Sequence, residues 1–189
     1  MRKLILRMLL TLDQVAAGEN NGQIDNVDYG DEGSWRDIFN TLKTVDAMLL
    51  GAAAHKEYLD YWHSVLSNPK ADANERRFAE IAAKTPHYVL SRTPRSLGYP
   101  NASVLPGGVD GIADLKRQQG GDIVLWGGPT VAAAAIEAGH VDEYHFDIHP
   151  VIAGRGKKLF ANVSRTQRLR HLSTDAHPSG VLTVKHANA

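Results

Sequence analysis

The chain has 189 residues, and its 21 Lys and Arg balance its 21 Asp and Glu, so the formal net charge is zero. This balance argues against a broad nucleic-acid-binding or membrane-binding face, because both need an excess of basic residues. The absence of cysteine excludes disulfides, thiol nucleophiles and thiolate metal sites. The length and the 43% of apolar residues fit a single globular domain over residues 1–189.

Residues 1–12 have the outline of a secretory signal, with a basic start and a run rich in leucine. Arg7 interrupts that run and Asp13 ends it, and the run is too short to cross a bilayer. We therefore interpret this segment as the first strand of the fold and expect a cytoplasmic protein.

Short apolar runs typical of strands recur along the chain. They lie at 4–10, 47–50, 88–90, 103–105, 123–126, 144–148, 169–172 and 181–184. Helical patterns separate them up to about residue 140, which predicts an α/β fold with a mainly parallel sheet and helices on both faces. The last two runs flank a tight turn and predict an antiparallel C-terminal hairpin.

Several of the intervening segments carry helix-start signals. Ser34 and Asp37 can form one capping box, and Asp72 can open another. Pro129 stands in the first turn of an alanine-rich helix. Residues 18–33 are rich in Gly, Asn and Asp, and they predict a loop of functional importance after the first strand.

Two strand ends offer candidate anion sites. Gly127 and Gly128 follow a strand and precede a helix, so backbone N–H groups can approach a pyrophosphate closely. A simple tight turn is the alternative, and the segment is neither a GxGxxG nor a Walker motif. Ser91, Arg92 and Thr93 follow another strand and can bind a ribose-linked phosphate, with a solvated turn as the alternative.

The order of these segments resembles the dihydrofolate reductase-like family, in particular the branch related to the reductase domain of bifunctional riboflavin-biosynthesis enzymes. The similarity lies in Gly127-Gly128-Pro129, in IEAGHVDE at 136–143, in PVIAGRG at 150–156 and in Leu159-Phe160. Weaker similarity covers LDQVAAG at 12–18, the segment 46–51 and KTPHYVLSRT at 84–93.

This resemblance implies a dihydrofolate reductase-like open mixed sheet that binds NADPH across the carboxyl ends of its strands. It implies hydride transfer to a small heterocycle related to pterins, pyrimidines or flavin precursors, in a homodimer. Ala17 would lie beside the nicotinamide, and Ser91, Arg92 and Thr93 would hold the adenosine ribose and its 2′-phosphate. The residues implied around the phosphates are Gly51, Ala52, Gly127, Gly128, Pro129, Thr130 and Val131.

The sequence departs from the family at two places. The family's Arg and Thr after Gly51 are absent, because Ala52, Ala53, Ala54 and His55 follow it here. A lost charge-assisted contact typically weakens affinity by about 10- to 100-fold. The family's opening glycine is Gln14 here, whose side chain would narrow the nicotinamide or substrate space. A non-catalytic or weakly catalytic binding protein on the same fold is therefore the alternative function.

Asp37 is the carboxylate nearest the substrate-binding acid of dihydrofolate reductases. There a raised pKa would help it to supply a proton, although it could instead cap its helix. Asp13 and Asp25 are the other candidate carboxylates. The candidate substrate wall consists of Gln14 and the aromatic residues Trp35, Phe39, Tyr58 and Trp62. At helical spacing, these aromatic residues could also simply fill a core.

His145, Asp147 and His149 alternate along one strand and share a face, which is compatible with a zinc or iron site. The alternative is the polar face of an ordinary strand, and we assign no metal. The basic residues between 155 and 170 could attract a phosphorylated ligand, but a solvated surface is the simpler interpretation.

Overall fold

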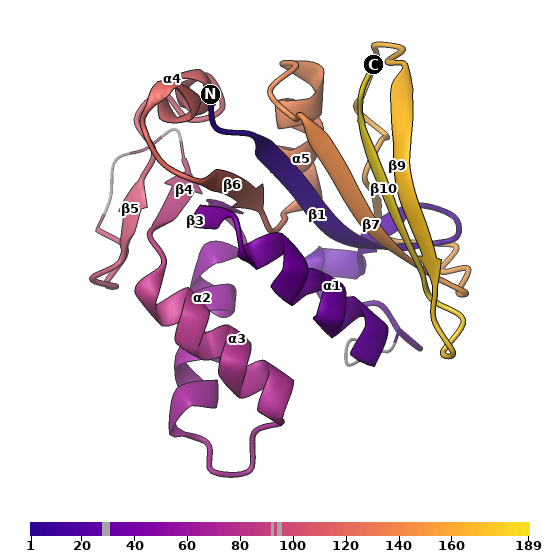
Figure 1. The fold of residues 1–189 in the computed structure, drawn as a ribbon, viewed down its shortest axis with the longest axis horizontal. Helices are drawn as coiled ribbons and strands as arrows, with labels where there is room; N and C mark the ends of the chain where they lie inside the picture. Colours follow the sequence, from indigo (N-terminus) through magenta and orange to yellow (C-terminus); the bar gives the residue numbers. More distant parts are fainter. Residues whose placement is uncertain (28–30, 92, 94–95) are drawn as a thin grey trace.

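The structure is a computed structural model that describes residues 1–27, 31–91, 93 and 96–189. Its centre is an eight-stranded sheet with the order β5-β4-β3-β6-β1-β7-β10-β9 (Figure 1). These strands are β1 (Leu4–Thr11), β3 (Val45–Gly51), β4 (His87–Leu90), β5 (Ala102–Val104), β6 (Asp122–Leu125), β7 (Glu143–His149), β9 (Leu169–Ala176) and β10 (Leu182–Asn188). The helices are α1 (Glu32–Leu42), α2 (His55–Ser67), α3 (Ala73–Lys84), α4 (Gly111–Arg117), α5 (Pro129–Glu137) and the short 3-10 helix η1 (Glu19–Asn21).

The sheet is mixed and mainly parallel, as the sequence predicts. Strands β5, β4, β3, β6, β1 and β7 run parallel to one another, and β10 pairs antiparallel with both β7 and β9. The carboxyl ends of the parallel strands therefore meet along one edge. A small antiparallel sheet of β2 (Val15–Ala17) and β8 (Lys157–Lys158) was not predicted, because neither strand is long enough to show a periodic pattern.

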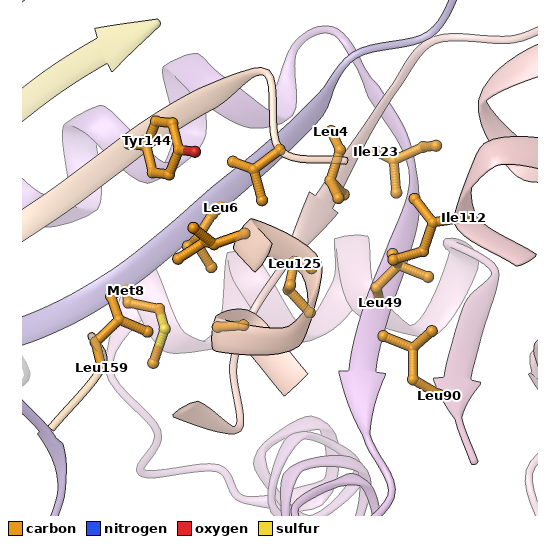
Figure 2. Close-up of a cluster of buried hydrophobic side chains, with 14 of the residues drawn as sticks. Leu4, Leu6, Met8, Leu49, Leu90, Ile112, Ile123, Leu125, Tyr144 and Leu159 are labelled. Atoms are coloured by element: carbon orange, nitrogen blue, oxygen red, sulfur yellow. The ribbon is translucent and has the colours of Figure 1, made fainter. Parts of the chain in front are cut away.

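The strand β1 shows how the sheet separates two cores. Leu4, Leu6 and Met8 point to one face, where they pack in one cluster with Ile112 of α4 (Figure 2). Ile136 of α5 belongs to the same cluster. The opposite face of the sheet packs against α1 and α3. Helices thus cover both faces, and the alternation of β1 turns Arg7 toward the α1 side. Within the described part of the chain, no helix has the length and apolarity needed to cross a membrane.

The first helix begins differently from the prediction. Its N-cap is Asp31, whose side chain accepts a hydrogen bond from the backbone N–H of Ser34 at 2.8 Å. The predicted cap at Ser34 and the capping box with Asp37 are therefore wrong, because the helix starts three residues earlier. The prediction for Asp72 is confirmed, since its carboxylate accepts a hydrogen bond from the N–H of Asn74 at 2.8 Å.

One histidine should make stability depend on pH. His87 is 1% exposed, and burial lowers the pKa of its imidazole from 6.5 to about 4. The unfolded chain therefore binds a proton at this residue in a pH range where the folded chain does not. We expect the free energy of unfolding to be highest above about pH 6.5 and to fall by up to about 3 kcal/mol as the pH drops toward 4.

Urea unfolding followed at about pH 7, 5.5 and 4.5 measures this loss. In His87→Leu the loss should be much smaller, because the titrating group is gone. The exposed His171 gives a matched control, His171→Leu, which should keep the wild-type slope. An unchanged slope in His87→Leu would contradict the assignment.

Candidate functional site

Two glycine-bearing loops touch at the carboxyl edge of the sheet. The N–H of Gly51, the last residue of β3, donates a hydrogen bond to the carbonyl of Gly127, just after β6, at 3.2 Å. A Cβ atom on Gly128 would lie 3.6 Å from the Cα of Gly51, and one on Gly51 would lie 3.1 Å from Val131. Gly127 and Gly128 have φ angles of 124° and 80°, in the region that favours glycine. The loops therefore form a cradle lined by backbone.

The start of α5 adds hydrogen-bond donors to this cradle. Gly128 is the N-cap, and Pro129 at the first helical position has no N–H. In the described ranges, no acceptor is found for the N–H groups of Gly128 and Thr130. Thr130 is exposed and Val131 half-buried. Unpaired N–H groups and the positive end of the helix dipole make this position suitable for an anion such as a pyrophosphate.

The cradle continues toward β4. Gly51 is in register with Leu90, so Ser91 lies one strand away from Ala52. The Ser91 hydroxyl donates to the carbonyl of Thr93 at 3.1 Å, and the two residues form a turn at the strand end. Arg92 lies outside the described residues. The Nδ1 atom of the buried His55 contacts the carbonyl oxygen of Ala52 at 2.8 Å, so this ring is bound to its own loop.

On the other side of the cradle, the chain turns from β1 into β2. Gln14 stands in this turn with a φ angle of 68°, and its side chain is exposed. A positive φ angle favours glycine, so a glycine in place of Gln14 would suit the backbone conformation at this position. Ala17 ends β2 and pairs with Lys157 of β8 in the small two-stranded sheet.

Asp13 connects this turn to the segment after β7. Its carboxylate accepts hydrogen bonds from the Thr11 hydroxyl at 2.6 Å and from the N–H groups of Ala153 and Gly154, each at 3.0 Å. The Thr11 hydroxyl and these two N–H groups lower the pKa of Asp13 to about 2. The candidate acid is therefore ionised at neutral pH and serves as a clamp between two loops.

A cleft of about 370 Å³ opens beside this clamp. One wall is the loop that follows β2, and the other is the segment that follows β7. Glu19 and Arg155 face each other across the cleft, with 3.8 Å between their charged groups. The lining residues are Gly18, Glu19, Gln23, Ile24, Asp25, Asn26, Val151, Ile152, Ala153 and Arg155.

Asp37 belongs to a buried charge cluster between α1 and the sheet. Its carboxylate accepts a hydrogen bond from the guanidinium of Arg7 at 2.5 Å and another from Lys185. Arg7 also donates to Asp147 at 2.7 Å, and Asp147 accepts from the hydroxyl of Thr183 at 2.6 Å. Burial alone would raise the pKa of Asp37, but Arg7 and Lys185 outweigh it and lower the pKa. The expected raised pKa is therefore wrong.

The four predicted substrate-wall aromatics lie in the core between α1, α2 and α3. The ring centroids of Trp62 and Phe78 are 4.4 Å apart, and those of Trp35 and Phe39 are 5.8 Å apart. The Tyr58 hydroxyl contacts a methionine sulfur, and burial raises its pKa. The pocket beside Trp62 has a volume of only about 10 Å³. This packing leaves no room for a heterocycle among these rings.

His145, Asp147 and His149 do share one face of β7, as their alternation predicts. His145 lies 3.1 Å from Glu143 and 3.3 Å from Thr41, whereas Asp147 is bound by Arg7. Among the residues whose placement is given, no three His, Asp or Glu side chains are grouped so that they could hold a metal ion. Neighbouring side chains already bind His145 and Asp147.

The sequence reasoning missed the role of Arg7 and Lys185. Arg7 interrupts an otherwise apolar strand, and that interruption was itself a signal. A charged residue inside a fully buried strand needs a partner of opposite charge, because burial of an unpaired charge is very unfavourable. The pattern could not identify the two partners, Asp37 on α1 and Asp147 on β7, which lie 30 and 140 residues away.

Replacing Arg7 tests the energetic weight of this cluster. In Arg7→Met, Asp147 would stay buried without a cation, so we expect the free energy of unfolding to fall by about 3–5 kcal/mol. Lys56→Met is the matched control, because it breaks an exposed ion pair with Asp60 and should change the free energy of unfolding far less than Arg7→Met. Urea denaturation measures the free energy of unfolding of both variants. Equally small losses of this free energy in the two variants would contradict a buried cluster.

Comparisons with known proteins agree with this geometry. The sequence profile of the family described as the RibD C-terminal domain matches residues 2–183. The uncharacterized protein YyaP of Bacillus subtilis (strain 168) is 28% identical over 183 residues, which are 97% of this chain and 93% of YyaP.

Two solved structures share the fold. The diaminohydroxyphosphoribosylaminopyrimidine deaminase/5-amino-6-(5-phosphoribosylamino)uracil reductase of Thermotoga maritima has a TM-score of 0.66 at 15% identity, over 100% of this chain and 57% of that one. The dihydrofolate reductase of Enterococcus faecalis, complexed with NADP(H) and RAB-propyl, has a TM-score of 0.62 at 14% identity, over 98% and 96%. The fold is therefore dihydrofolate reductase-like, as the resemblance implied.

Proposed function

The chain belongs to the family described as the RibD C-terminal domain, and we propose that it is an NADPH-dependent reductase. In this proposal it transfers a hydride to a C=N bond of a small heterocycle, in the cytoplasm. Support for a reductase-like function comes from the family and from two structural neighbours that are named as reductases. One of these neighbours is complexed with NADP(H).

The backbone cradle at Gly51, Gly127 and Gly128 is the observation that carries the proposal. The strand order brings the ends of β4, β3, β6 and β1 side by side along the carboxyl edge, and Ser91 and the cradle follow the first three of these strands. Neighbouring strands are about 4.8 Å apart, so these positions form an elongated track. An extended dinucleotide fits it with the adenosine near Ser91, the pyrophosphate at the start of α5 and the nicotinamide near Ala17.

The chain's own groups would bind, orient and shield the reactants. Backbone N–H groups at the start of α5 would hold the phosphates, and the loop after β2 would cover the reacting end and exclude water. Bound NADPH supplies the hydride. Reduction of C=N to CH–NH also takes up one proton. Because Asp13 and Asp37 both have lowered pKa values, that proton would come from water rather than from these carboxyls.

One observation favours the alternative of a binding protein without turnover. Residues 52–54 are all alanine, so the loop after β3 presents no cation to the phosphates. Such a protein would bind a nucleotide or another small molecule in the same cradle. NADPH that binds, but is not oxidised with any pterin or pyrimidine tested, would favour this function.

Thr130→Glu tests the phosphate position without weakening the helix. A carboxylate in the first turn interacts favourably with the helix dipole, so the melting temperature should not fall. The same charge would repel a pyrophosphate, so we expect the Kd for NADPH to rise by at least about tenfold. Thr130→Gln has a similar size without the charge and should bind like wild type. Equal NADPH affinity of the two variants would contradict the assignment.

We also propose a homodimer formed through β9. This edge strand is exposed along nearly its whole length, and Leu169 and Leu172 are each 37% exposed. Arg170 and Asp175 share a face of the sheet, because they lie opposite Ala187 and Thr183 of β10. Symmetric antiparallel pairing of two β9 strands would place each Arg170 opposite the partner copy's Asp175 and would cover both edges.

A charge swap tests this dimer. Arg170→Asp and Asp175→Arg should each shift the protein toward monomer, because each one places like charges opposite one another. The double variant restores opposite charges and should recover the dimer. Light scattering after size exclusion gives the mass in each case. The proposed pairing is wrong if the wild type is a monomer at all concentrations. It is also wrong if the double variant forms no more dimer than the single variants.

A further inference from the structure

Two histidines lie side by side on β10 and β9, the last two strands at one edge of the sheet (Figure 1). His186 of β10 is in register with His171 of β9. The centroids of their rings are 5.5 Å apart, and the ring planes meet at 74°. His171 is exposed and His186 is half-buried, so solvent reaches both imidazoles. The proposed reductase function does not use this pair.

A bulge in the strand pairing brings the two rings opposite each other. Lys185 lies opposite Ser173, and the next residue, His186, lies opposite His171. Leu172 is therefore an extra residue in β9. Bulges of this kind redirect side chains at sheet edges. With regular pairing, Leu172 rather than His171 would lie opposite His186, so the histidine pair depends on this local irregularity.

The hydrogen bonding of the two rings is compatible with metal ligation. Nε2 of His171 lies 2.9 Å from the hydroxyl oxygen of Thr174. When Nε2 donates to this hydroxyl, Nδ1 of the same ring carries the lone pair. Histidines that bind metals are typically fixed in this way by a partner for the other nitrogen. For the ring of His186, no hydrogen bond is found within the described ranges.

The spacing of the rings suits two ligands of one metal ion. Zn–N bonds of about 2.0–2.1 Å at a tetrahedral angle put the centres of two imidazoles about 5 Å apart. The observed separation of 5.5 Å needs only a small side-chain adjustment to reach this value. Imidazole is a ligand suited to Zn²⁺, Cu²⁺ and Ni²⁺, whereas Mg²⁺ and Ca²⁺ prefer oxygen ligands.

The nearest basic side chains are turned away from the pair. Lys185 binds Asp37 on the α1 side of the sheet. Arg170 lies opposite Ala187, which neighbours His186 in β10, so Arg170 belongs to the face opposite to that of the two imidazoles. A cation bound between His171 and His186 would therefore be separated from both positive charges by the sheet.

We propose that His171 and His186 together chelate one divalent late first-row metal ion such as Zn²⁺, with water in its remaining positions. A site with two protein ligands agrees with the lack of a group of three such side chains in the described part of the chain. The site is remote from the glycine cradle, because His186 lies opposite Tyr144 near the amino end of β7. The bound ion would connect the edge strand β9 to β10.

Calorimetric titration of Zn²⁺ into the metal-free full-length protein tests the site. We expect wild type to bind one Zn²⁺ per chain at this pair. His171→Gln and His186→Gln should each raise the Kd for Zn²⁺ at least about tenfold, because each leaves a single imidazole. His63→Gln is the control, since this ring is also exposed but stacks on Tyr99, and it should bind Zn²⁺ like wild type.

Stoichiometry separates a chelate from two independent histidines. If the rings bound separate ions, each single variant would lose one Zn²⁺ per chain while the Kd of the other stayed unchanged, and that result would overturn the proposal. Equal Zn²⁺ affinity of wild type and both variants would overturn it too, as would failure of wild type to bind Zn²⁺. Melting temperatures in the presence of a chelator check that the variants fold, and they should match wild type.

Wild-type protein alone provides a second measurement that needs no variant. One equivalent of Zn²⁺ should shift the imidazole ¹⁵N resonances of both His171 and His186, and Mg²⁺ should shift neither. Zn²⁺ should also raise the melting temperature, because it binds the folded chain. Shifts at only one of the two rings, or at neither, would contradict chelation by the pair.

Discussion

The guanidinium of Arg7 is the group around which the α1 side of the molecule is organised. It lies in the middle of β1 at 2% exposure, where an unpaired cation would be strongly unfavourable. Its carboxylate partners, Asp37 and Asp147, come from α1 and β7, and Lys185 of β10 also binds Asp37. Two cations and two carboxylates compensate one another in this cluster. The cluster therefore requires one helix and three strands to assemble in a single arrangement.

The hydrogen bonds around Arg7 continue through the C-terminal hairpin to the start of α1, where the loop after β2 ends. The Thr183 hydroxyl donates to Asp147, so its oxygen is available to accept from Nε2 of His177, 2.8 Å away. The imidazole of His177 lies against Gly33, where a Cβ atom would be 1.9 Å from Nδ1. Ser179, in the same turn, donates to Asp31, the N-cap of α1. The C-terminal hairpin thus fixes the start of α1, where the loop after β2 ends.

Local signals were enough to predict the central strands, the mainly parallel character of the sheet and the glycine turn before α5, because each is indicated by residues close together in the sequence. The roles that failed depend on distant partners. The pKa of Asp37 is set by Arg7 and Lys185, and Asp13 is bound by residues 140 and 141 positions away. Trp35 and Trp62 had a periodicity that fits a core as well as a ligand wall, and only packing against Phe78 distinguishes the two.

These long-range interactions also restrict how a reduction could obtain its proton. A clamp that holds Asp13 at a pKa of about 2 and a cluster that keeps Asp37 ionised remove both carboxyls as acids at neutral pH. A carboxylate can still assist in another way, because a negative group beside a ring nitrogen raises the pKa of that nitrogen. In the cleft between the loop after β2 and the segment after β7, Glu19 and Asp25 are such carboxylates, so a ring bound beside them would be favoured in its protonated form. That ring would then carry the proton that neither Asp13 nor Asp37 is able to donate.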